Sequence, residues 1–142
     1  MKLRKSIVLS LAAIIITGTT LWGQDSEKLV SDRIQIKFFS STPAEDIEAF
    51  NTASVSTINK VTGEVVFSVP MQGFEFEKSL MQKHFNSDKF LDTKTYPKAK
   101  LTGKIINTEA VDFSKDGSYQ ATVEGELTLK GVTNSIKEKG TI

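Results

Sequence analysis

The stretch that decides the fold runs Phe74-Glu-Phe76-Glu-Lys-Ser-Leu80-Met81-Gln-Lys-His84-Phe85-Asn86. Phe76, Leu80 and His84 follow one another at intervals of four residues, which predicts a short helix with these side chains on one face. Isolated helices below about 12–15 residues are marginal in water. We therefore expect this helix to pack on an apolar surface, and the nature of that surface to decide the function.

The N-terminus has the pattern of a secretory signal peptide. Lys2, Arg4 and Lys5 precede an apolar run over residues 7–16, and small residues follow it. The run is too short for a membrane-spanning helix, which needs roughly 20 apolar residues. We predict a signal peptide over residues 1–23, export of the mature protein, and one domain over residues 24–142 with no transmembrane span in the mature chain.

Charge and cysteine content narrow the function classes. The 142 residues carry 18 Lys and Arg, 17 Asp and Glu, and no Cys. Removing residues 1–23 removes three basic residues and no acidic one. The remainder then has 15 Lys and Arg against 17 Asp and Glu, a net charge of −2. A mildly acidic domain gives no electrostatic case for nucleic-acid binding. The lack of Cys excludes a disulfide framework, so stability must come from a buried core.

Most of the remaining chain alternates between apolar and polar residues, as half-buried strands do. The predicted strands are 31–39, 53–59, 64–69, 99–105, a return strand from Tyr119 to Leu129, and a last one from Ser135. A capping box at Thr42 predicts a short helix through Phe50. Asp116-Gly117 predicts a tight hairpin turn, and Gly125 a bend. About six strands with short turns indicate an antiparallel all-β fold, either a barrel or a sandwich.

Little in the sequence indicates catalysis. With no Cys and one His, neither a zinc site of several His or Cys ligands nor a Cys–His dyad can form. His84 is expected to be packed and hydrogen-bonded rather than to act as a general base. Glu45, Asp46 and Glu48 are expected to complement the predicted helix rather than to bind metal. We therefore predict no enzyme, no catalytic residue and no metal; a small hydrolase built around His84 is the minority hypothesis.

Two motifs resemble the YceI-like family. The first is the opening stretch followed by Tyr96-Pro97-Lys98-Ala99, and the second is Gly125-Glu-Leu127-Thr-Leu129-Lys130-Gly131-Val-Thr133. The resemblance runs from Ser31 to the end of the chain, with the motifs in order. Two departures stand out: Lys130 occupies a position that is often His in the family, and family members continue with further strands. The resemblance therefore predicts a domain that is truncated at its C-terminus.

The resemblance implies a lipocalin-like antiparallel β-barrel with short helical insertions, exported to the periplasm. The barrel is expected to hold a polyisoprenoid or another long-chain amphiphilic lipid, such as a quinone-type molecule, without cofactor or catalysis. The cavity is then expected to be lined or gated by Phe74, Phe76, Leu80, Phe85 and Phe90, and more weakly by Tyr96, Leu101, Ile105, Tyr119 and Leu127. His84, Lys83 and Lys98 are the candidates to meet a polar head group.

The residues leave one alternative open. An alternating barrel has an interior that is either filled by side chains or left as a cavity, and periodicity does not distinguish the two. The alternative is an exported interaction or stress-related β-domain with a filled core and no lipid ligand. Its open sheet edge would pair with a partner. A homodimer is a further expectation about partners.

Overall fold

A computed structural model describes residues 27–142, so the predicted signal peptide lies outside the described residues. The described chain contains strands β1 to β7, one α-helix and two single turns of 3-10 helix. Their bounds, in chain order, are β1 Lys28–Ser41, β2 Asp46–Asn59, β3 Glu64–Pro70, the 3-10 turn Met71–Gly73, β4 Phe74–Phe76, α1 Ser79–Asn86, β5 Lys98–Ile105, the 3-10 turn Thr108–Ala110, β6 Gln120–Leu129 and β7 Val132–Thr141.

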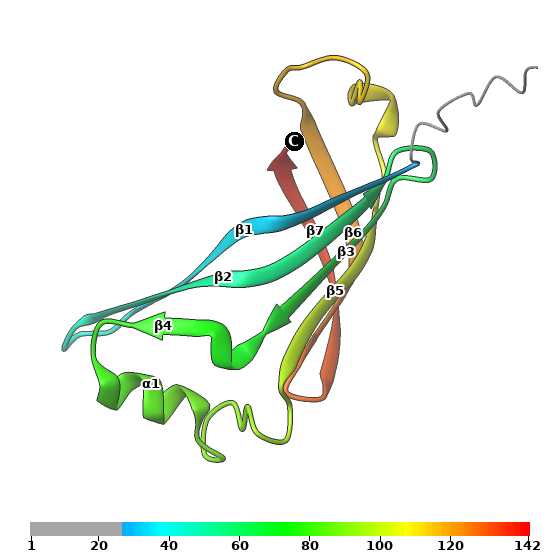
Figure 1. Cartoon of the computed structure of the whole chain (residues 1–142). Coiled ribbons are helices and arrows are strands. Elements are labelled where there is room, and N and C mark those ends of the chain that lie inside the picture. Colours follow the sequence, from blue (N-terminus) through cyan, green and yellow to red (C-terminus); the bar gives the residue numbers. More distant parts are fainter. Residues whose placement is uncertain (1–26) are drawn as a thin grey trace, which may run out of the picture.

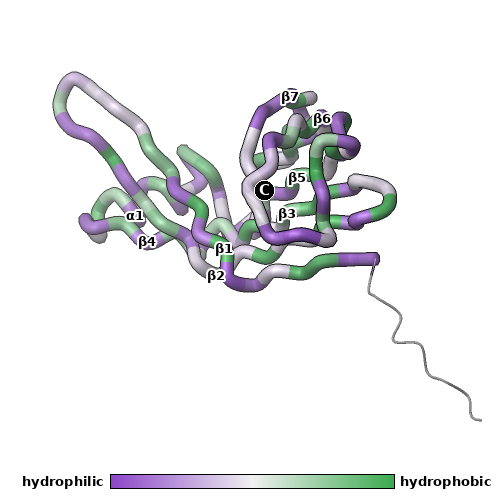
Figure 2. The backbone as a smooth tube through the Cα atoms, turned by 90° about the horizontal axis from the view of Figure 1, so that it is seen from above, coloured by the Kyte–Doolittle hydropathy of each residue, from purple (hydrophilic) through white to green (hydrophobic). Residues whose placement is uncertain are grey.

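The strands form one antiparallel sheet in the order β1-β2-β3-β5-β6-β7, and β4 pairs separately with β2. The sheet curls into a half-barrel, with α1 lying beside β4 at one end and the C-terminus at the other (Figure 1). Seen from above, β1 and β2 run along one side while β5, β6 and β7 curve away from them, and green and purple segments alternate along the strands (Figure 2). The predicted fold class, an antiparallel all-β barrel with a short helical insertion, is confirmed.

The helix predicted between Thr42 and Phe50 is wrong. The Thr42 hydroxyl donates to the Glu45 carbonyl oxygen at 2.7 Å and accepts from the Glu45 N–H at 3.1 Å, so this capping pair closes a turn between β1 and β2. The following residues pair with β1, with Ala49 opposite Phe38. Ala49 is fully buried. Pairing with a long neighbouring strand therefore overrides the local helix signal.

The central helix is shorter than the sequence predicts. Phe74 to Phe76 forms β4, in which both Phe side chains point inward and Glu75 is exposed. The backbone of this strand pairs with Ala49, Phe50 and Asn51 of β2. Only Ser79–Asn86 is helical, and Phe85 is its one buried side chain.

Two predictions near the C-terminus are also wrong: the position of the tight turn and the start of the last strand. Lys130 and Gly131 have φ of 48° and 72°, and Leu129 pairs with Val132, so these two residues form the tight hairpin turn and the last strand starts before Ser135. Asp116-Gly117 instead lies within the long connection between β5 and β6. The hairpin turn around Gly63, by contrast, is confirmed, with φ of 74°.

Gly125 does not interrupt β6, whose pairing with β5 and β7 is continuous. Gly125 instead lies opposite Gly103, and a Cβ on Gly125 would be 2.3 Å from the Thr102 carbonyl oxygen. The two glycines therefore allow β5 and β6 to approach closely where the sheet curls.

The core consists of two separate apolar clusters. One, beside α1, contains Ala49, Met71, Phe74, Phe85 and Ala99. The other, at the far end of the strands, contains Val65, Ile105, Val111 and Ala121. The space that concerns function borders the first cluster.

Candidate ligand-binding pocket

A pocket of about 540 Å³ opens on the concave side of the sheet, next to α1. Thirteen of its fifteen lining residues are apolar, and they come from β1, β3, the 3-10 turn Met71–Gly73, β4, α1, the connection after α1, β5 and β6. They are Ile36, Phe38, Phe67, Val69, Met71, Phe74, Phe85, Phe90, Leu91, Ala99, Leu101, Leu127 and Leu129. A small-molecule site typically has a volume of about 300–1,000 Å³ and mostly apolar walls. The pocket has both properties.

Phe85 is the centre of an aromatic cluster on this wall. Its ring centroid lies 5.6 Å from that of Phe38, 5.4 Å from Phe74, 4.9 Å from Phe76 and 6.1 Å from Phe90. The ring planes are tilted or edge-on, an arrangement that aromatic pairs favour. Phe85 is only 4% exposed. Docking of α1 through this one side chain therefore builds the wall where helix and sheet meet.

The two lysines that border the pocket direct their charges away from it. Lys37 forms an ion pair with Glu48, and its ammonium lies 5.6 Å and 5.7 Å from the ring centroids of Phe39 and Phe50. These groups occupy the convex face of β1 and β2. Lys100 is exposed between the inward residues Ala99 and Leu101 of β5, because side chains alternate along a strand. The interior of the pocket is therefore apolar.

The turn between β6 and β7 forms part of the rim. Lys130 donates from Nζ to the Phe90 carbonyl oxygen at 2.7 Å, with a longer contact of 3.5 Å to the Asp88 carbonyl oxygen. A Cβ on the neighbouring Gly131 would be 2.8 Å from the Tyr96 ring. The turn thus packs on the connection that follows α1. These contacts hold Phe90 over the pocket.

The structure brings five of the ten predicted lipid-contacting residues together in the pocket wall. These are Phe74, Phe85, Phe90, Leu101 and Leu127. Phe76 lines an adjoining pocket of about 320 Å³, which shares Phe38, Phe85 and Phe90 with the first. Tyr96 lies at the rim, against Gly131.

The other three predicted residues lie away from the pocket. Ile105 and Tyr119 belong to the second core cluster, because β5 and β6 extend well beyond the pocket. Leu80 is 63% exposed and lines neither of the two apolar pockets. The reason is the helix orientation: Met81 and Phe85 face the sheet, and Leu80 lies one position, about 100°, away from them. The prediction that Leu80 shares the apolar helix face is wrong.

Sequence reasoning did not name Ile36, Phe38, Phe67, Val69 or Leu129 as lining residues, although all five line the pocket. The signal was available in part. Ile36 and Phe38 alternate with polar residues in β1, as Phe67 and Val69 do in β3, so the inward face was readable. The alternation does not predict whether that inward face packs against other side chains or borders a cavity.

The head-group candidates are exposed. His84 lines the adjoining pocket of about 320 Å³, and its carbonyl oxygen accepts a hydrogen bond from the Ser87 hydroxyl at 2.7 Å. Its imidazole makes no hydrogen bond with any side chain between residues 27 and 142. The expectation of a packed, hydrogen-bonded His84 is therefore wrong. Lys83 and Lys98 are exposed and line neither apolar pocket.

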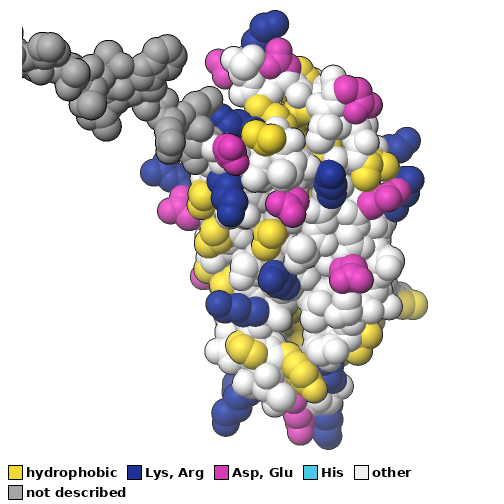
Figure 3. Space-filling model, turned by 90° about the vertical axis from the view of Figure 1, so that its right-hand side faces the viewer, with side chains coloured by type: hydrophobic (Ala, Val, Ile, Leu, Met, Phe, Trp, Pro, Cys, Tyr) yellow, Lys and Arg dark blue, Asp and Glu magenta, His cyan; other side chains and the backbone are white. Residues whose placement is uncertain are grey.

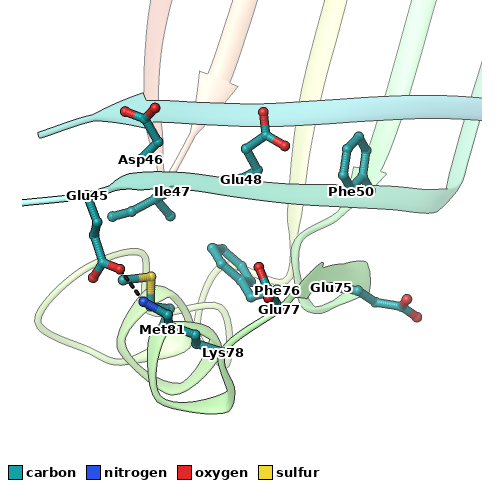
Figure 4. Close-up of a pocket in the computed structure, with 10 residues that line it drawn as sticks. All are labelled: Glu45, Asp46, Ile47, Glu48, Phe50, Glu75, Phe76, Glu77, Lys78 and Met81. Carbon is teal, nitrogen blue, oxygen red and sulfur yellow. Dashed lines mark hydrogen bonds and ion pairs between the residues drawn. The ribbon is translucent and has the colours of Figure 1, made fainter.

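An acidic depression lies beside the adjoining pocket (Figure 4). Three of its five carboxylates engage separate partners: Glu45 pairs with Lys78, Glu48 pairs with Lys37, and Asp46 accepts from the Ser41 hydroxyl at 2.7 Å. The hydrogen bond to Glu45 raises the pKa of Lys78 above its usual 10.5. In the described part of the chain, no group of three or more acidic or His side chains has an arrangement that could hold a metal ion.

No described helix is both long enough and apolar enough to cross a bilayer. Three solved structures illustrate the likeness to known proteins. A polyisoprenoid binding domain from Saccharophagus degradans aligns with a TM-score of 0.65 at 14% identity, covering 81% of this chain and 66% of that one. The chain thus spans about two thirds of that domain's length, and this identity establishes the fold alone.

The YceI protein of Campylobacter jejuni aligns at 15% identity with a TM-score of 0.44, over 96% of this chain and 67% of that one. BcnA of Burkholderia cenocepacia aligns at 14% identity with a TM-score of 0.41, over 78% of this chain and 56% of that one. No curated protein sequence matches the chain. The model of the YceI-like domain matches residues 28–142. Together with the antiparallel half-barrel, this match establishes that the chain belongs to the YceI-like family.

Proposed function

We propose that this protein binds a polyisoprenoid or another long-chain amphiphilic lipid in the pocket beside α1, as a non-catalytic carrier or store in the periplasm. One observation carries the proposal: the pocket of about 540 Å³ has apolar side chains on every contributing element and no inward charge. Family membership supports it, as does the shared fold of the Saccharophagus degradans polyisoprenoid binding domain.

The physics of the pocket favours an apolar chain over a charged metabolite. Burying apolar surface contributes about 25 cal/mol per Å², so burying roughly 200 Å² of lipid contributes about 5 kcal/mol before the costs of association. A charge moved into the same space would lose its hydration without gaining a partner. The hydrocarbon tail therefore occupies the pocket, and the polar head group stays at the rim.

The adjoining pocket supports a position for the head group. It shares Phe38, Phe85 and Phe90 with the tail pocket and adds the more polar Ser40, Thr42 and His84. We place the head group beside His84, with Lys83 and Lys98 as secondary candidates. The alternative of a filled core is less well supported, because it predicts no space at this position.

Native mass spectrometry tests the proposal. The purified protein, mixed with a prenyl lipid and transferred to volatile buffer, is expected to carry one bound lipid. Leu127→Asp places a charge in the wall and should abolish this adduct, because an aspartate there would be desolvated by the lipid. The matched control is Leu29→Asp, since Leu29 is similarly exposed, 44% against 37%, and lies outside the pocket.

Two results would contradict the proposal. One is a wild-type protein that ignores every prenyl lipid offered to it. The other is an L127D protein that binds as well as L29D while both remain folded by circular dichroism.

A further inference from the structure

Positive charge is concentrated in one segment, residues 78–100, which covers α1, the connection after it and the start of β5. This segment, called here the basic end, contains six Lys and two Asp, a formal charge of +4. The other described residues contain nine Lys and Arg against fourteen Asp and Glu, a formal charge of −5. Five of these acidic residues, Glu45, Asp46, Glu48, Glu75 and Glu77, line the depression beside α1, so the positive excess belongs to this segment alone.

Most lysine side chains of the basic end form no ion pair or hydrogen bond with the described part of the chain. Within residues 27–142, the ion pairs given by the structure engage Lys37, Lys78, Lys115 and Lys137. The basic end has five further lysines, all exposed and without a hydrogen-bond or ion-pair partner in the described chain: Lys83, Lys89, Lys94, Lys98 and Lys100. Their charges are free to meet an external anionic surface.

Large apolar side chains protrude among these lysines. Leu80 is 63% exposed, Phe90 53% and Tyr96 37%. At the lower end of the view in Figure 3, Lys or Arg side chains and Asp or Glu side chains both lie beside exposed hydrophobic ones. Phe90 also lines the tail pocket, so apolar surface continues from the interior to the outside of the basic end.

We propose that the basic end docks on the surface of an anionic phospholipid bilayer and that lipid passes between the bilayer and the pocket past Phe90. The proposal rests on the proposed function, since a lipid pocket is what this docking would serve. Basic side chains are attracted to anionic head groups, while Leu80, Phe90 and Tyr96 gain by entering the interfacial region. An acidic protein would satisfy the lysines but would not supply the lipid that the adjacent pocket is shaped to take.

Vesicle co-sedimentation tests the docking surface. The probe is phosphatidylcholine vesicles with or without about one third phosphatidylglycerol, and every variant keeps the same N-terminus so that its contribution cancels. Lys89→Gln/Lys94→Gln removes two charges from the basic end. The matched control, Lys104→Gln/Lys139→Gln, removes two exposed charges towards the opposite end of the strands. Neither pair lines the tail pocket.

We expect the wild-type protein to bind anionic vesicles more tightly than neutral ones. Each lysine near such a surface changes affinity roughly fivefold, so K89Q/K94Q should weaken binding about 25-fold while the control changes it less than about twofold. Raising the salt concentration from about 0.01 to 0.15 M shortens the screening length from about 30 to 8 Å and should weaken binding as well. Leu80→Ser should weaken binding to anionic vesicles without altering the salt dependence.

Failure of the docking is separable from failure of the lipid pocket, because the native mass-spectrometric adduct is measured without vesicles. If K89Q/K94Q carries the lipid adduct and also binds vesicles as the wild type does, the docking proposal is overturned and the pocket stands. Equal losses in both double variants, or equal wild-type binding to neutral and anionic vesicles, would overturn it too.

Discussion

Lys130 in the β6–β7 turn donates a hydrogen bond of 2.7 Å to the carbonyl oxygen of Phe90, forty positions earlier in the chain. One partner sits in a two-residue turn that requires positive φ, and the other covers the candidate pocket. The contact therefore links the C-terminal hairpin to the rim.

The Lys130 contact predicts a kinetic effect. Lys130→Met keeps the aliphatic stem but removes the donor, so the connection carrying Phe90 should open more often and a fluorescent prenyl lipid should dissociate several-fold faster. A single exposed hydrogen bond contributes only about 1 kcal/mol, so thermal stability should fall little. Lys137→Met, which breaks a surface ion pair with Glu124 elsewhere, is the control. Identical release rates in wild type and K130M would refute the role of this contact.

Phe85 should dominate the stability of the end of the sheet beside α1. Phe85→Ala removes a 4%-exposed ring in contact with four other aromatic rings, and truncations of this kind cost about 3–5 kcal/mol. Urea denaturation measures the loss. Phe39→Ala, at a position 53% exposed on the convex face, should cost less than about 1 kcal/mol. Comparable losses in both variants would mean that α1 is not anchored through Phe85.

The close approach of β5 and β6 predicts a contrast between two glycines. Gly125→Ala would place Cβ 2.3 Å from a backbone oxygen, which no side-chain movement relieves, and overpacking of this kind costs about 1–3 kcal/mol. Gly140→Ala meets nothing within 4 Å and should be neutral or slightly stabilising. Chemical denaturation of the two variants side by side measures the difference. An unaffected G125A would show that the sheet can curl without this contact.

The Lys78–Glu45 pair predicts an alkaline pH dependence. The hydrogen bond to Glu45, followed by its charge, raises the pKa of Lys78 above 10.5 in the folded protein. A raised pKa stabilises the folded state below the unfolded pKa, and this contribution is lost as pH rises through the higher folded value. In Glu45→Gln, the pKa of Lys78 measured by NMR titration should therefore fall towards 10.5. An unchanged titration in E45Q would contradict the pairing of α1 with the β1–β2 turn.

Much of the fold was predictable from the sequence because strand alternation is a local property. The alternation of Ile34, Ile36 and Phe38 identifies β1, and the positive φ that Gly63 supplies fixes the turn between β2 and β3. The family followed from two motifs. Phe74 and Phe85 of the candidate pocket lie in the stretch that the sequence singled out, and Phe90 follows it by four residues.

The two errors in helix prediction share one cause, which is that tertiary pairing outweighed a valid local signal. Thr42 to Glu45 has the residues of a helix cap, yet pairing of the next residues with β1 makes them a strand. Phe76 and Leu80 have helical spacing, yet β4 pairs with β2 and turns Phe76 inward while Leu80 remains in solvent. In both cases the segment pairs with a strand that is distant in sequence, and a local sequence pattern contains no information about that partner.

The sequence by itself determined which side chains face inward, because the period of a strand allows no other arrangement for an apolar–polar alternation. Only the tertiary structure decided whether the inward faces of opposite strands pack against each other or leave a space between them. Around Ile105 they meet and fill the interior, whereas around Phe85 they stand apart and leave a pocket. The difference lies in the curl of the sheet and the position of α1. Both depend on contacts between residues distant in sequence, such as Gly103 with Gly125 and Lys130 with Phe90.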